Sequence, residues 1–114
     1  MQPVILEATF DLDADEQAAV NIDPDYARSY TQVPGLTWKI WIRDPDSRRN
    51  GGIHLFAGRE LAEDYLGKLR ARMAARPDVT GFTATIYDVK VNASRLTHGP
   101  VETAAASGAG GREG

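Results

Sequence analysis

Two stretches of the chain alternate apolar and polar side chains residue by residue, which leaves few folds open to it. In Val4–Leu12 every second residue is apolar, and Leu36–Arg43 alternates in the same way while being rich in β-branched and aromatic residues. A period of two places successive side chains on opposite faces of an extended chain. Both stretches are therefore predicted to be β-strands that bury one face.

Residues 53–57 and 80–91 are predicted to be two further strands. The loop before the third strand, residues 44–52, is dense in Asp, Pro, Asn and Gly, which favour turns. A connection this short joins antiparallel neighbours, so the second and third strands are expected to form a hairpin.

Two helices separate the strands. Asp13 and Glu16 have the spacing of a capping box, and Asp23 before Pro24 predicts that the first helix starts there, because Pro suits the first helical position. Residues 58–76 carry apolar side chains at a spacing of three and four, the pattern of a helix with one buried face.

The order of these elements is strand, helix, strand, strand, helix, strand. This order predicts a ferredoxin-like α+β fold, βαββαβ, in which a four-stranded antiparallel sheet carries two helices on one face. Residues 1–100 are expected to form this single domain. Residues 101–114 are rich in Ala and Gly and are expected to form a disordered tail.

Sorting the strand residues by parity predicts two unlike sheet faces. The helix-facing set is almost wholly apolar: Val4, Leu6, Ala8, Phe10, Leu36, Trp38, Ile40, Ile42, Ile53, Leu55, Phe82, Ala84 and Ile86. The opposite face mixes polar residues with an apolar patch: Ile5, Trp41, Phe56, Tyr87 and Val89. Exposed apolar patches mark interfaces, so this second face predicts a homodimer about a two-fold axis.

The alternative is that these aromatic residues are individually exposed and inert. Glu7 and Lys39 are expected on the same face, as an ion pair across the interface.

Composition excludes several classes of protein. A formal net charge of −3 gives no basic surface for nucleic acid. The chain has no cysteine and two histidines, which argues against thiolate chemistry and most metal sites. No apolar run reaches the roughly 20 residues that span a bilayer, and the N-terminus lacks a secretory pattern, so a cytoplasmic location is expected.

Two motifs carry a resemblance to a known family. The first is Pro-Gly-x-x-Trp-Lys-x-Trp starting at Pro34, and the second is Gly-Gly-Ile-x-Leu-Phe starting at Gly51. With the spacing of the elements from Val4 to Pro100, they resemble the small bacterial YdhR-like mono-oxygenases. That family is related to the antibiotic-biosynthesis monooxygenases of the dimeric α/β-barrel superfamily. The chain departs from the family pattern at Asp23-Pro24-Asp25 and at His54, where an aromatic residue such as tyrosine is common.

The resemblance implies a monooxygenase that uses neither metal nor flavin. Its substrate would be a small electron-rich aromatic compound of the phenol, hydroquinone or anthrone type, and its second substrate dioxygen. Two other functions fit the same fold: a small-molecule-binding module without catalysis, and a cyclase or isomerase that uses the same pocket.

The candidate catalytic residues are His54, Trp38 and Tyr65. His54 is either a general base or a histidine satisfied at the interface. Trp38 is expected on the helix-facing side, as a cavity wall or as part of the core, and tyrosines such as Tyr65 either donate to a developing oxyanion or pack in the core. The candidate substrate-binding residues are Tyr26, Tyr30, Trp41, Phe82 and Asp88.

Overall fold

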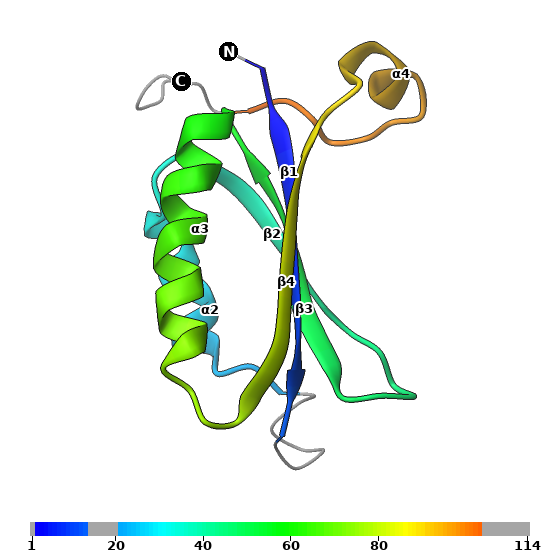
Figure 1. Cartoon of the computed structure of the whole chain (residues 1–114). Coiled ribbons are helices and arrows are strands. Elements are labelled where there is room, and N and C mark those ends of the chain that lie inside the picture. Colours follow the sequence, from blue (N-terminus) through cyan, green and yellow to red (C-terminus); the bar gives the residue numbers. More distant parts are fainter. Residues whose placement is uncertain (1, 14–20, 104–114) are drawn as a thin grey trace.

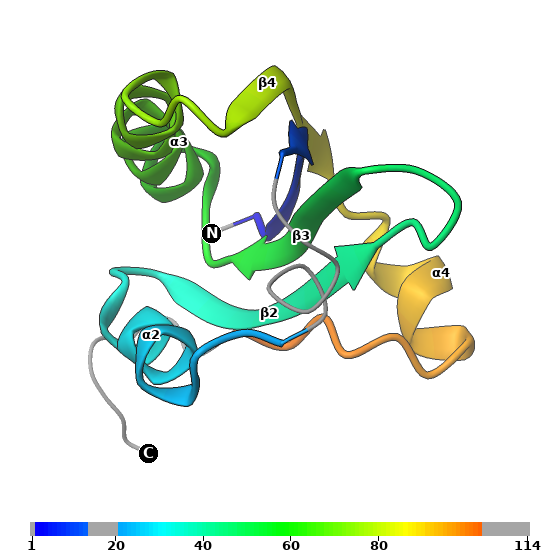
Figure 2. The ribbon, with the colours of Figure 1, turned by 90° about the horizontal axis from the view of Figure 1, so that it is seen from below.

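The computed structural model describes residues 2–13 and 21–103. Its elements follow the predicted order: β1 Val4–Leu12, α2 Pro24–Ser29, the 3₁₀-helix η1 Tyr30–Gln32, β2 Leu36–Arg43, β3 Arg49–Phe56, α3 Arg59–Ala74, β4 Val79–Asp88 and α4 Val91–Leu96. The four strands form an antiparallel sheet in the order β2-β3-β1-β4. Helices α2 and α3 cover one side of this sheet, and α4 lies toward the other side (Figures 1 and 2). The predicted ferredoxin-like fold is confirmed.

Both predicted helices are present. Asp23 is the N-cap of α2 and Pro24 is its first residue, as predicted, although the Asp23 side chain makes no capping hydrogen bond. Glu16 of the predicted capping box lies outside the described residues. Helix α3 ends at Ala74, shortly before Pro77. In the described part of the chain, no helix combines the length and the apolar character needed to cross a bilayer.

The core lies between the sheet and α3. Leu6 on β1 and Phe56 on β3 are fully buried, and Leu69 and Met73 of α3 belong to the same cluster. Four residues of α3 at a spacing of three and four are buried: Ala62, Tyr65, Leu69 and Met73. The predicted apolar face of β1 is therefore the face that meets the helices.

Strand β3 is longer than predicted. Residues 49–52, which the turn composition assigned to a loop, extend it back to Arg49. Gly51 pairs with Thr9 on one side and Ile42 on the other. The Arg49 side chain donates to the Gly81 carbonyl oxygen at 2.7 Å and to Thr83 Oγ1 at 2.8 Å. Partners on both neighbouring strands thus override the turn propensity of this segment.

The predicted faces of β2 and β3 are wrong, and an irregularity in β2 explains the error for that strand. Leu36 lies opposite Phe56, but Trp38 lies opposite Leu55, so two steps along β2 correspond to one step along β3. Such a bulge reverses the side of every residue that follows it. Trp38, Ile40 and Ile42 therefore point away from α2 and α3, whereas Lys39 and Trp41 point toward them.

The face of β3 follows from its pairing with β1. Val4 lies opposite Phe56 and Leu6 lies opposite His54, and directly opposed residues share a face. His54 and Phe56 are therefore on the helix side, and Ile53 and Leu55 are on the other side. The parity assignment placed these two pairs the other way round because it followed apolar character alone.

The chain after α4 runs along β2 on the side away from α2 and α3 (Figure 2). Trp38 Nε1 donates to the Pro100 carbonyl oxygen at 2.9 Å, and Val101 is buried. Val101, the first residue of the expected tail, is therefore in contact with the domain. The rest of the expected tail, residues 104–114, lies outside the described residues.

Candidate active site

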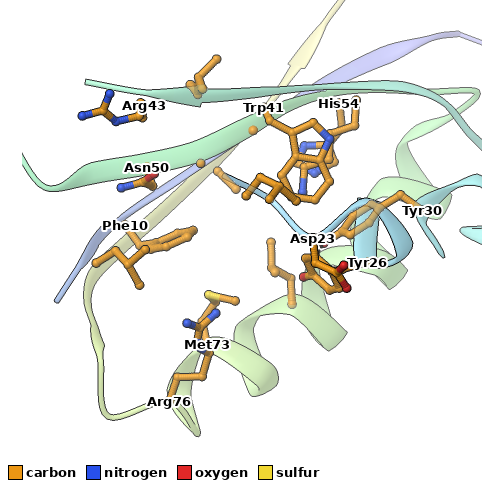
Figure 3. A pocket seen from close by; sticks show the side chains of 18 of the residues that line it. Phe10, Asp23, Tyr26, Tyr30, Trp41, Arg43, Asn50, His54, Met73 and Arg76 are labelled. Carbon is orange, nitrogen blue, oxygen red and sulfur yellow. Dashed lines mark hydrogen bonds between the residues drawn. The ribbon is translucent and has the colours of Figure 1, made fainter. Parts of the chain in front are cut away.

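A cavity of about 360 Å³ lies between the sheet and helices α2 and α3 (Figure 3). Four of the predicted site residues line it: Tyr26, Tyr30, Trp41 and His54. Phe10 and Met73 add apolar surface from β1 and α3. A mainly apolar and aromatic lining with a few polar groups is typical of sites for small organic ligands.

The other four predicted site residues do not line this cavity. Trp38 is on the opposite face of the sheet, and Asp88 pairs with Arg59 at 2.9 Å near the far end of β1. Phe82 packs against the core, with the Arg70 guanidinium 5.5 Å from its ring centroid. Tyr65 is buried behind Tyr30.

His54 presents an unpaired acceptor in this site. Its Nδ1 lies 3.0 Å from the Leu6 carbonyl oxygen. Because a carbonyl oxygen only accepts, Nδ1 carries the hydrogen and Nε2 carries a lone pair. Nε2 is buried and has no hydrogen-bond partner among the described residues. Burial lowers the pKa of His54 to about 4, with the Lys39 charge acting in the same direction and the Leu6 bond against it. The imidazole is therefore neutral at neutral pH.

Lys39 is the site residue that sequence reasoning missed. Its Nζ lies 3.5 Å from the ring centroid of Trp41 and 3.8 Å from that of Tyr30, and its backbone is directly opposite His54. Burial, and secondarily the Arg72 charge, lower the pKa of Lys39 to about 7. The expected ion pair with Glu7 is wrong, because the bulge in β2 moves Lys39 to the face opposite Glu7.

A hydrogen-bonded group of tyrosines holds the Tyr30 ring beneath Lys39. The Tyr30 hydroxyl accepts from Tyr65 and from Arg72, each at 2.9 Å, and lies 3.3 Å from the Tyr26 hydroxyl. Burial raises the pKa of Tyr26 and of Tyr30 to about 12. These phenols therefore stay protonated at neutral pH and act as walls and donors, not as bases.

The comparison with protein families agrees with this architecture. Residues 5–100 match the family described as "Putative mono-oxygenase ydhR". The chain belongs to this family. The family assignment places it among mono-oxygenases, a class of oxidoreductases, and confirms the resemblance found in the sequence.

A solved structure shares the fold of this ydhR family member. SnoaB from Streptomyces nogalater, described as a cofactor-independent oxygenase and solved as a mutant with one asparagine replaced by alanine, aligns with a TM-score of 0.59 and 15% sequence identity. The alignment covers 79% of the present chain and 95% of the SnoaB chain. No match was found among curated proteins.

The glycine pair that carried the resemblance has a role in the site of this ydhR family member. A Cβ on Gly52 would lie 2.6 Å from Lys39 Cε and 3.2 Å from His54 Cε1. Gly52 thus leaves the room in which these two side chains meet the cavity. The bulge that brings Lys39 there has no clear sequence signal, and the adjacent glycines are the feature of the sequence that could have pointed to a crowded site. Among the described residues, no group of three His, Cys, Asp or Glu side chains could hold a metal ion.

Proposed function

We propose that this protein is a cofactor-independent mono-oxygenase that oxidises a small electron-rich aromatic compound of the phenol, hydroquinone or anthrone type. The observation that carries the proposal is His54 Nε2, a buried acceptor without a described partner in an aromatic cavity. Family membership supports the reaction class, and SnoaB, which has the same fold, is described as a cofactor-independent oxygenase.

The cavity suits a flat aromatic molecule. Its volume of about 360 Å³ lies within the range of small-ligand sites, roughly 300–1,000 Å³. Tyr30 and Trp41 meet edge to face with ring centroids 5.1 Å apart, and Tyr26 meets both. Aromatic walls of this kind bind ring systems by stacked and edge-to-face contacts, and they exclude water from the reacting carbon.

The proposed reaction needs only a substrate anion and dioxygen. His54 Nε2 accepts a hydrogen bond from a phenol or enol hydroxyl and orients it. The anion formed from this group gives one electron to dioxygen, and the two radicals combine into a peroxide. For an anthrone, the methylene carbon and dioxygen become a carbonyl group and one molecule of water. Both electron pairs come from the two carbon–hydrogen bonds.

Oxygen consumption tests this function. The protein should consume dioxygen with hydroquinones or anthrones, unchanged by added chelator or flavin, and one labelled oxygen atom should enter the product. His54→Phe removes the acceptor and is expected to lower kcat/KM by about tenfold or more, the loss expected when a buried substrate hydroxyl loses a hydrogen-bond partner. His98→Asn is the matched control, since His98 is exposed and Asn tolerates its positive φ of 66°.

The same assay separates the alternatives. No oxygen uptake across this substrate class would contradict the proposal. Conversion of substrate under anaerobic conditions would indicate a cyclase or isomerase. Quenching of Trp41 fluorescence without any product would indicate a binding module.

A further inference from the structure

Two side chains that line the cavity each carry a nitrogen atom without a described partner. His54 Nε2 is an acceptor, and Lys39 Nζ, on the adjacent strand, forms no hydrogen bond or ion pair with the described residues. On its other side Lys39 Nζ is covered by the faces of Tyr30 and Trp41. Lys39 and His54 lie opposite each other on adjacent strands, so a substrate hydroxyl in this part of the cavity meets both side chains.

We propose that Lys39 is the base and counter-ion of the reaction. Its amine takes the proton of the substrate hydroxyl, and the ammonium group that results stays beside the substrate oxygen. His54 Nε2, which offers only a lone pair, accepts from the hydroxyl while the neutral substrate binds, and it makes no hydrogen bond to the anion. This inference rests on the proposed function, which supplies the aromatic occupant of the cavity, and it narrows the substrate to a compound that binds as a neutral phenol or enol and ionises in the site.

The two candidate bases differ in strength. A general base works best when its pKa lies near the pH of the reaction. Burial brings the pKa of Lys39 to about 7, whereas that of His54 falls to about 4, too low to hold a phenol proton. The ammonium form of Lys39 is in turn compatible with the aromatic faces of Tyr30 and Trp41, which attract a cation.

The charges around Lys39 favour an anionic partner. The titratable and charged groups that face the cavity or act on Lys39 come from every packed element: Asp23, Tyr26, Tyr30, Arg43, His54, Arg72, Arg76 and Asp78. Arg76 and Asp78 neutralise each other in a two-bond pair at 3.0 and 2.7 Å. Burial, and secondarily the charge of Arg72, disfavours the ammonium form of Lys39, so that near pH 7 a large fraction of the side chain is a neutral amine. Two cations, Arg43 and Arg72, then remain against a single carboxylate, that of Asp23.

The protons balance through Lys39. The amine accepts one proton as the substrate anion forms, and the ammonium returns it to the peroxide anion after dioxygen has combined with the carbon. The amine then removes the second hydrogen of that carbon while the oxygen–oxygen bond breaks. The hydroxide that leaves takes this proton and departs as water, which restores the neutral amine.

A phenol with a coloured anion tests the inference without any turnover. We would titrate the wild-type protein with 3-nitrophenol at a pH below the pKa of the free phenol, and record the phenolate absorbance. The expected result is that the bound probe absorbs as phenolate. Lys39→Met should bind phenolate at least about tenfold more weakly and show the neutral spectrum, since one pKa unit corresponds to a tenfold change. Lys68→Met, on an exposed position of α3, is the matched control and should behave as the wild type.

Lys39→Arg separates a base from a counter-ion. Arginine stays charged, so this variant should still show the phenolate spectrum while losing about a hundredfold or more in kcat/KM. The wild-type rate should rise with pH to a plateau above about pH 7, and this rise should vanish in the variant. A phenolate spectrum in Lys39→Met, or full turnover in Lys39→Arg, would overturn the inference. Phenolate capture without any oxygen uptake would instead count against the proposed function.

Discussion

Lys39 brings an ionisable group into an aromatic cavity, and this placement has a cost for folding. Burial lowers the pKa of Lys39 from 10.5 to about 7, while the aromatic faces of Tyr30 and Trp41 offset only part of the lost hydration. A group whose pKa is lowered by folding opposes the folded state whenever it is protonated. The residue proposed to carry the chemistry is therefore one that destabilises the protein at low pH.

Replacing Lys39 should show this cost directly. Between about pH 7 and 10.5 the unfolded chain binds a proton that the folded chain does not, so wild-type stability rises with pH across this window. Below it the penalty is fully present. Lys39→Met is therefore expected to be more stable than the wild type by about 2–5 kcal/mol near pH 6, where the upper bound is the full shift in pKa, with a gap that shrinks toward pH 10.

Urea unfolding near pH 6, 8 and 10 measures this gap. Lys68→Met is the control, because Lys68 is exposed and its removal should give the same small difference at each pH. A gap between Lys39→Met and the wild type that stays constant with pH would contradict the prediction.

At the scale of elements, β3 contains two adjacent glycines with different tasks. A Cβ on Gly51 would collide with the Ala8 carbonyl oxygen and lie 2.8 Å from Thr9 Cα, both backbone atoms of β1. A Cβ on Gly52 would instead meet the flexible Lys39 side chain. The first glycine allows the strands to approach, and the second makes room for the site.

The two glycine variants should separate stability from binding. Gly51→Ala is expected to lower the free energy of unfolding by about 2 kcal/mol or more, because backbone atoms must move. Gly52→Ala should keep the fold but displace Lys39, so that phenolate binding weakens about tenfold or more. Gly67→Ala on α3 meets nothing within 4 Å and is the control, expected to gain up to about 1 kcal/mol. Thermal unfolding and 3-nitrophenol titration read out both effects, and equal behaviour of the two strand variants would refute the distinction.

The irregularity in β2 marks the limit of what the sequence could predict. The period of two located β1 and β2 at their observed bounds, and Asp23-Pro24 located the start of α2. The side of each β2 residue depends on the extra residue between Leu36 and Trp38, which is fixed by pairing with β3 and not by local composition. A one-residue shift therefore put Trp38 in the predicted site and left Lys39 out of it.

His54 and Trp41 show why part of the site survived this error. His54 was chosen for its chemistry and not for its face, and both residues line the cavity. The pKa values of His54 and Lys39 depend on burial by elements distant in sequence, which no local pattern reveals.

At the scale of the whole molecule, the sheet face away from α2 and α3 is only partly covered. The chain after α4 meets Trp38 on this face. Ile40 is 53% exposed, Tyr87 49% and Ile42 37%. An apolar patch is therefore present on this face as expected, but its residues differ. Ile40 and Ile42 belong to it, whereas Trp41 and Phe56 lie on the helix side. We propose that a second copy of the chain covers it, since self-complementary apolar faces pair about a two-fold axis.

A charge placed at the centre of this face should prevent the pairing. Ile40→Glu is expected to convert a dimer into a monomer at micromolar concentration, because an unpaired carboxylate would be buried in the interface. Light scattering after size exclusion measures the mass, and Ala71→Glu on the exposed side of α3 is the control. Since the cavity lies on the other side of the sheet, Ile40→Glu should still bind 3-nitrophenol as phenolate. A wild-type monomer would contradict the proposed pairing, whereas loss of phenolate binding in the monomeric variant would mean that the partner subunit helps to shape the cavity.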